Sequence, residues 1–145
     1  MVKFRNIIIL FVCILFIGGS CSRVGRFIKI PVPAVSFNVY PYSIDYVLGP
    51  MGNYKIFPLQ GYAGIIVYHY TADEFLAFDL ACPNDFQNGC SVEYKSSELI
   101  LQCKCCGTTF SIFDGYPRSN VEAYPSPLHQ YNATLIQNDV LYVTN

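Results

Sequence analysis

Residues 101–110 have the sequence LQCKCCGTTF, in which three cysteines lie within four consecutive positions between two β-prone runs. The apolar run before them (99–103) predicts one strand, and the β-branched run after them (108–113) predicts another. Cys103 and Cys106 form a C-x-x-C pair followed by glycine, a spacing that lets two sulfurs converge on one metal ion. A thioredoxin site uses the same spacing but needs a helix after it, whereas a strand is predicted here.

Short β-prone runs continue outward from the cysteines along the chain. The sequence holds 12 Tyr and 11 Phe with abundant Val and Ile, which favours strands over helices. Two hairpins are predicted, with strands at residues 63–70 and 75–82 and at residues 131–136 and 140–144. The polar residues 83–98 and the proline-rich residues 116–128 are expected to form turns and loops. Since no helical period of useful length occurs, the sequence predicts an all-β fold.

The strand predicted at residues 75–82 has two faces of different composition. Because alternate side chains of a strand point to opposite faces, the residues divide into two sets. One face carries Leu76, Phe78 and Leu80, and the other carries Phe75, Ala77 and Asp79. The more apolar first face is the one expected to point into the core.

Length and charge limit the possible functions. A chain of 145 residues is long enough for one domain with one hydrophobic core. Only 13% of the residues are charged, the net charge is −1, and no basic run occurs. Nucleic acid is therefore not expected as a partner.

The N-terminus has the features of an export signal. Lys3 and Arg5 precede an unbroken apolar run, residues 7–17, and a run of small residues then ends at Cys21. The small residues before this cysteine resemble a bacterial lipobox. We therefore expect residues 1–20 to be a signal peptide, Cys21 to carry a lipid, and residues 21–29 to form a tether. A domain at residues 30–145 would face the periplasm or the cell surface, anchored to the membrane through the lipid.

The number of cysteines leaves several disulfide pairings and metal sites open. Of the seven cysteines, Cys13 falls in the predicted signal and Cys21 at the lipidation site. Five remain, an odd number, so they cannot all form disulfides within one monomer. These are Cys82, Cys90, Cys103, Cys105 and Cys106. A zinc site with Cys82, Cys90, Cys103 and Cys106 as ligands is conceivable, but Cys82 and Cys90 lack the spacing of a second zinc knuckle.

Two cysteine-containing boxes resemble those of the Rieske-type iron–sulfur domain. Box one is Cys82-Pro83-Asn84, and box two is the stretch CKCCGTTF at residues 103–110. The separation of the boxes, the Gly-Thr-x-Phe tail and the closing hairpin are similar to that family over roughly residues 60–145. The resemblance implies an antiparallel sheet sandwich with a small inserted cluster-binding lobe at about residues 79–117.

The resemblance also implies a ligand set for a [2Fe–2S] cluster. The two cysteines that hold one iron in this family fall on Cys82 and Cys103. The two histidines that hold the other iron fall on Asn84 and Cys106, so one ligand becomes a thiolate. Asn84 or Cys90 would supply the fourth ligand. Alternatively, Cys90 and Cys105 match a cysteine pair that forms a disulfide between the two loops in respiratory members, and Cys90 cannot do both.

The function implied by the resemblance is electron transfer with a redox protein partner, by a carrier that is not itself an enzyme. Replacing imidazole by thiolate should lower the reduction potential of a cluster. His69 and His129 lie outside both boxes and are expected on strand or loop surfaces. The alternative is a cluster-free binding or structural module, stapled by disulfides or holding zinc, because the thiols would reach an oxidising compartment empty.

Overall fold

The computed structural model describes residues 30–119, 126–137 and 139–145, and it confirms an all-β, antiparallel fold. Two short 3₁₀ turns, η1 (Tyr46–Leu48) and η2 (Phe86–Asn88), interrupt the strands. Among the described residues, no helix has the length and apolar character needed to cross a membrane. The predicted signal peptide (1–20), Cys21 and the tether (21–29) lie outside the described residues.

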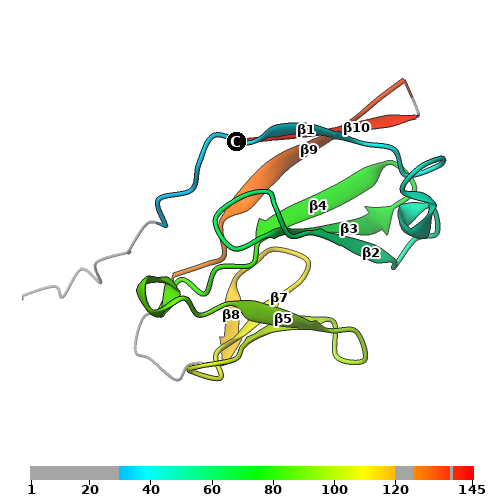
Figure 1. The fold of residues 1–145 in the computed structure, drawn as a ribbon. Helices are drawn as coiled ribbons and strands as arrows, with labels where there is room; N and C mark the ends of the chain where they lie inside the picture. Colours follow the sequence, from blue (N-terminus) through cyan, green and yellow to red (C-terminus); the bar gives the residue numbers. More distant parts are fainter. Residues whose placement is uncertain (1–29, 120–125, 138) are drawn as a thin grey trace, which may run out of the picture.

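The larger of two sheets has six strands in the order β1-β10-β9-β4-β3-β2. Figure 1 shows it curled, with β1, β10 and β9 turning over β4, β3 and β2. Both hairpins expected from the sequence are confirmed, since β3 pairs with β4 and β9 with β10. The strands are β1 (Ser36–Val39), β2 (Tyr54–Phe57), β3 (Ile65–Thr71), β4 (Glu74–Asp79), β9 (Gln130–Ile136) and β10 (Val140–Thr144).

The smaller sheet has four strands in the order β5-β6-β7-β8 and lies below the larger sheet in Figure 1. Its strands are β5 (Val92–Lys95), β6 (Ile100–Cys103), β7 (Thr109–Ser111) and β8 (Pro117–Ser119). They follow one another in the chain between β4 and β9, in the region where we expected an inserted lobe. Strands β5 and β8 fall in segments predicted as turns and loops. Sequence patterns miss strands this short, whose identity depends on pairing with β6 and β7.

The hydrophobic core fills both sides of β3 and β4. Ile66 and Phe78 pack between the two sheets against Leu101 and Phe110 of the smaller sheet. The expectation that only one face of β4 points into the core is therefore incomplete. Phe75 and Ala77 on the opposite face are also buried, because the curled sheet brings strands β1 and β10 over them. The buried residues on that side include Val35, Val39, Leu141 and Val143.

One glycine fixes the distance between the smaller sheet and β4. Gly115, in the turn between β7 and β8, has φ +69° and lies against the ring of Phe78. A Cβ atom at this position would meet a Phe78 ring carbon at 2.8 Å, so no other residue fits without displacing that ring.

Asp79 ends β4 and is the central polar residue of the fold. Its carboxylate is fully buried and accepts four hydrogen bonds. Oδ2 accepts from Tyr62 N–H at 2.7 Å and from the Tyr131 hydroxyl at 2.8 Å. Oδ1 accepts from Ala81 N–H at 2.8 Å and from Ala63 N–H at 3.2 Å. These bonds connect the end of β4 to the 58–64 loop, to β9 and to the chain leading to Cys82.

Replacing Asp79 should therefore destabilise the whole domain. Asp79→Ala leaves three backbone N–H groups and a hydroxyl without their buried acceptor, so we expect the free energy of unfolding to fall by about 3 kcal/mol or more. Tyr131→Phe removes one of the four bonds and should lower it by about 1–2 kcal/mol. Urea unfolding of the full chain measures both. Asp73→Ala, in the exposed β3–β4 turn, is the control and should change stability by less than about 0.5 kcal/mol; equal losses for Asp73→Ala and Asp79→Ala would contradict this role.

Candidate metal centre

Two loops far apart in sequence bring four potential metal ligands together. Cys82 and Asp85 come from the segment after β4, and Cys103 and Cys106 come from the end of β6 and the loop that follows it. One ligand atom from each of the four lies within 4.8 Å of every other, and the sulfurs of Cys82 and Cys106 are 3.7 Å apart. This group could hold a metal ion.

The first loop turns back on itself directly after Cys82. Asp85 N–H donates to the carbonyl oxygen of Cys82 at 3.1 Å, which closes a tight four-residue turn. Pro83 occupies the second position of that turn, where its fixed φ is favourable. The turn returns the fourth residue, Asp85, to the side of the first, Cys82. Asp79 holds the start of this segment through Ala81 N–H.

The second loop forms a compact knuckle at the end of β6. Cys103 N–H donates to the carbonyl of Thr108 at 2.9 Å, and Gly107 N–H donates to the carbonyl of Cys103 at 3.1 Å. Gly107 has φ +72°, in the left-handed region that other residues adopt only with strain. The knuckle thus directs the sulfurs of Cys103 and Cys106 from opposite ends of one turn toward the first loop.

The four ligands differ in burial. Cys82 and Cys103 are buried, whereas Cys106 and Asp85 are partly exposed. Asn84 lies beside the group, and its side-chain amide donates to Thr108 Oγ1 at 3.2 Å. Since Thr108 Oγ1 accepts this bond, its hydroxyl hydrogen is free to donate to Cys106 Sγ, 3.2 Å away. Asn84 therefore positions Thr108 beside the Cys106 sulfur, which is a different role from the ligand role expected for it.

The two buried thiols differ in acidity. Burial, together with a hydrogen bond to Cys103, raises the pKa of the Cys82 thiol. Burial also acts on Cys103, but hydrogen bonds from the Cys82 thiol and from the N–H groups of Cys106 and Cys105 outweigh it and lower the pKa of Cys103. Cys103 is thus the thiol that ionises first, and the neutral Cys82 thiol donates to it. Binding of a cation would displace the Cys82 proton, since metal ligands are thiolates.

A disulfide between Cys90 and Cys105 joins the two loops, which is the pairing that the resemblance implied. The Cα atoms of this pair are 6.0 Å apart, and 15 positions separate them in sequence. The expectation that Cys90 could be the fourth ligand is wrong in this structure, because its sulfur is bonded to Cys105. Cys82, Cys103 and Cys106 remain as free thiols among the described residues.

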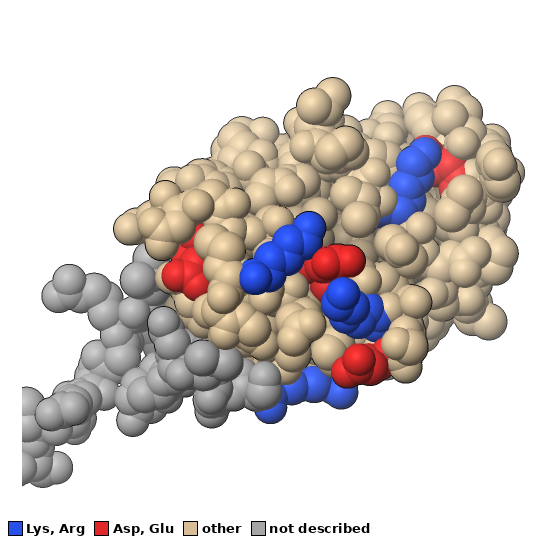
Figure 2. Space-filling model, turned by 60° about the horizontal axis from the view of Figure 1, so that its bottom comes forward, with Lys and Arg blue, Asp and Glu red and all other residues tan. Residues whose placement is uncertain are grey.

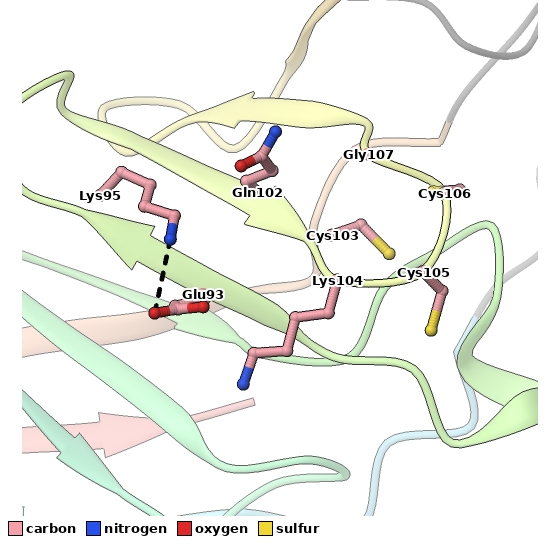
Figure 3. Close-up of a pocket in the computed structure, with 8 residues that line it drawn as sticks. All are labelled: Glu93, Lys95, Gln102, Cys103, Lys104, Cys105, Cys106 and Gly107. Atoms are coloured by element: carbon pink, nitrogen blue, oxygen red, sulfur yellow. Dashed lines mark ion pairs between the residues drawn. The ribbon is translucent and has the colours of Figure 1, made fainter.

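The outer side of the knuckle is open to solvent through a shallow pocket. Figure 3 shows the loop from Cys103 to Gly107 around one end of it, with Glu93, Lys95 and Gln102 contributed by β5 and β6. Glu93 and Lys95 form an exposed ion pair at 3.5 Å. Figure 2, with the smaller sheet turned forward, shows basic and acidic side chains interspersed over an otherwise uncharged face. Neither sign of charge dominates the described part of the face that Figure 2 shows.

The sequence singled out three of the four ligands of the group but not the fourth. Asp85 was not among the ligands expected from the sequence, whereas the structure places its carboxylate within 4.8 Å of the three sulfurs. One sequence signal could have indicated Asp85. Pro83 favours a four-residue turn that begins at Cys82, and the last residue of that turn, which comes back beside Cys82, is Asp85 and not Asn84.

The histidines play no part in this group. His69, expected on the surface, is only 2% exposed and stacks on Phe75 with ring centroids 4.2 Å apart. Its Nδ1 lies 2.7 Å from the Leu48 carbonyl oxygen, on the far side of the large sheet from the knuckle. His129 is half-buried and packs edge-on against Tyr131. The surface placement was wrong for His69 because the curled sheet covers both faces of β3.

No protein-family model matches the sequence, and no curated protein matches it.

The disulfide should contribute measurably to stability. Closing a loop of about 15 residues lowers the entropy of the unfolded chain, which corresponds to about 3 kcal/mol. We expect the full-length Cys90→Ala/Cys105→Ala variant, unfolded by urea with chelator present, to lose about that amount. The chelator removes any bound metal, so the difference in stability between the two proteins reports the disulfide alone. Unchanged stability of the variant would contradict this contribution. Under reducing conditions the unmodified protein also lacks the disulfide, so a difference of the same size between the two proteins there would contradict it as well.

Proposed function

We propose that this chain is a metal-binding module on a Rieske-like scaffold, held at the bacterial cell envelope by a lipid on Cys21. The observation that supports it most is the convergence of Cys82, Asp85, Cys103 and Cys106, from two separate loops, within 4.8 Å. Four groups that carry negative charge when ionised repel one another at this separation. A bound cation removes that repulsion and compensates for the burial of the sulfurs.

The hydrogen bonds around the sulfurs support the same function. N–H groups of Cys105 and Cys106 donate to the Cys103 sulfur, and Asn84 N–H donates to the Cys82 sulfur. The Thr108 hydroxyl lies within donating distance of Cys106. The backbone donors to Cys82 and Cys103 favour the thiolates over the thiols of these two residues, and outer groups of this kind orient and tune metal ligands.

The placement of the loops supports the Rieske-like scaffold. Box one (82–84) and box two (103–110) lie side by side at one end of the smaller sheet, and the Cys90–Cys105 disulfide joins the segment after box one to box two. This is the arrangement expected from the resemblance. The module would then be a non-catalytic binding or structural unit in which the metal fastens the two loops together.

Electron transfer through a [2Fe–2S] cluster, with a redox protein as partner, is the alternative. Two features favour it: the ligand set has four members, the number that such a cluster needs, and a disulfide connects the loops. When bound, such a cluster supplies one-electron transfer at a potential set by its ligands and their hydrogen bonds. The close spacing of the ligand atoms favours a single ion over this alternative.

Metal binding should stabilise the fold in a concentration-dependent manner. Added Zn²⁺ at about 100 times its dissociation constant should raise the free energy of unfolding by about 2.7 kcal/mol, because only the folded chain presents the site. Urea unfolding of the full chain with and without Zn²⁺ measures this. The Cys82→Ser/Cys103→Ser/Cys106→Ser variant should show no increase. The Asp73→Asn variant is the control, because Asp73 lies in the exposed β3–β4 turn away from the group, and it should keep the increase; stability unaffected by Zn²⁺ in the unmodified chain would refute the proposal.

A further inference from the structure

We propose that the cysteine group holds a single tetrahedral metal ion of the zinc class, with Cys82, Asp85, Cys103 and Cys106 as its four ligands, and not a two-iron cluster. This inference rests on the proposed metal-binding function and specifies its occupant. The proposed occupant differs from the [2Fe–2S] cluster that the two cysteine-containing boxes imply.

The separation of the ligand atoms is the first observation that points to one ion. Two sulfurs that each lie about 2.3 Å from a tetrahedral zinc ion are about 3.8 Å apart. The sulfurs of Cys82 and Cys106 are 3.7 Å apart, and all four ligand atoms lie within 4.8 Å of one another. In a [2Fe–2S] cluster, ligands on different irons are further apart than ligands of one ion, because the width of the core separates them.

The identity of the close pair is the second observation. In the ligand pattern implied by the resemblance, Cys82 and Cys103 share one iron, while Cys106 belongs to the other. Cys82 and Cys106 would then stand on opposite sides of the cluster. Their sulfurs are instead as close as two ligands of the same ion. The boxes are spaced like those of a cluster domain, but the sulfurs they carry meet at one point.

Asp85 completes the tetrahedron. The turn at residues 82–85 brings its carboxylate within reach of the three sulfurs. Asn84, the competing candidate, instead directs its amide to Thr108. Since three thiolates and a carboxylate fill all four positions, the site resembles structural zinc sites, which have no open position, and differs from catalytic ones. Soft thiolates favour Zn²⁺ over Mg²⁺ or Ca²⁺.

Elemental analysis of the full chain, purified from membranes in detergent without oxygen, distinguishes the two occupants. We expect one metal ion per chain and no acid-labile sulfide. Two irons and two sulfides per chain would overturn the single-ion inference while the metal-binding function stood. A preparation without metal that also takes up neither Zn²⁺ nor Co²⁺ would overturn the proposed function itself, as would a disulfide between Cys82 and Cys106 in the isolated protein.

Substitution of the fourth ligand tests the coordination, with Co²⁺ as the probe. Bound Co²⁺ should give the thiolate charge-transfer absorption and the visible bands of a tetrahedral ion. Asp85→Asn should weaken Co²⁺ affinity by more than about 100-fold and alter the visible bands, as loss of a direct ligand exceeds the effect of outer groups. Asn84→Ala removes only an outer hydrogen bond, so it should weaken affinity by about 10- to 100-fold and leave the bands unchanged.

Asp73→Asn is the matched control, since it removes the same charge in an exposed turn and should bind Co²⁺ as the unmodified chain does. Near-ultraviolet circular dichroism of each variant verifies that the aromatic core is intact. Unaltered bands and affinity in Asp85→Asn, or a change of bands in Asn84→Ala, would overturn the assignment of Asp85 as the fourth ligand.

Discussion

The convergence of two loops on one point is the constraint on which the rest of this structure depends. The loop that follows β4 and the knuckle that follows β6 belong to different sheets, so neither positions its sulfurs for the other by local structure alone. Three features hold them in place. The Asp79 carboxylate fixes the end of β4, the Gly115 turn packs the smaller sheet on Phe78, and the Cys90–Cys105 disulfide joins the loops themselves.

The same packing explains why the sulfurs require partners. The core cluster between the sheets includes Cys82 and Cys103 together with apolar residues, so these thiols lie in surroundings that disfavour charge. Burial raises the pKa of Cys82, while backbone N–H groups and the Cys82 thiol lower that of Cys103. Cys103 therefore loses its proton before Cys82 as the pH rises, and a bound cation would make thiolate ligands of both. Asp85 and Cys106 are partly exposed, so a cation could reach the group from solvent through them.

The geometry is compatible with the scaffold that the resemblance implies, and we propose a different occupant for it. The boxes, the two antiparallel sheets and the disulfide between the loops suit a Rieske-like domain. On that proposed scaffold, the two histidine positions of the family would fall on Asn84 and Cys106. With the imidazoles absent, a short thiolate reaches inward from one loop and the carboxylate of the next residue, Asp85, reaches inward from the other. The four ligand atoms lie within 4.8 Å of one another, which suits one ion better than two.

The sequence by itself determined the all-β class, both hairpins of the larger sheet and the three thiols of the site, because alternation, β-branched runs and cysteine spacing are local properties. It did not determine strands β5 and β8, which are too short to be recognised without their partners, nor the burial of both faces of β4 and of His69, which follows from the curl of the sheet. Only the tertiary structure decided between Asn84, Asp85 and Cys90 beside the sulfurs. Neighbouring residues of a turn point in different directions, and a cysteine becomes a ligand or a disulfide partner according to what the fold brings within reach of its sulfur.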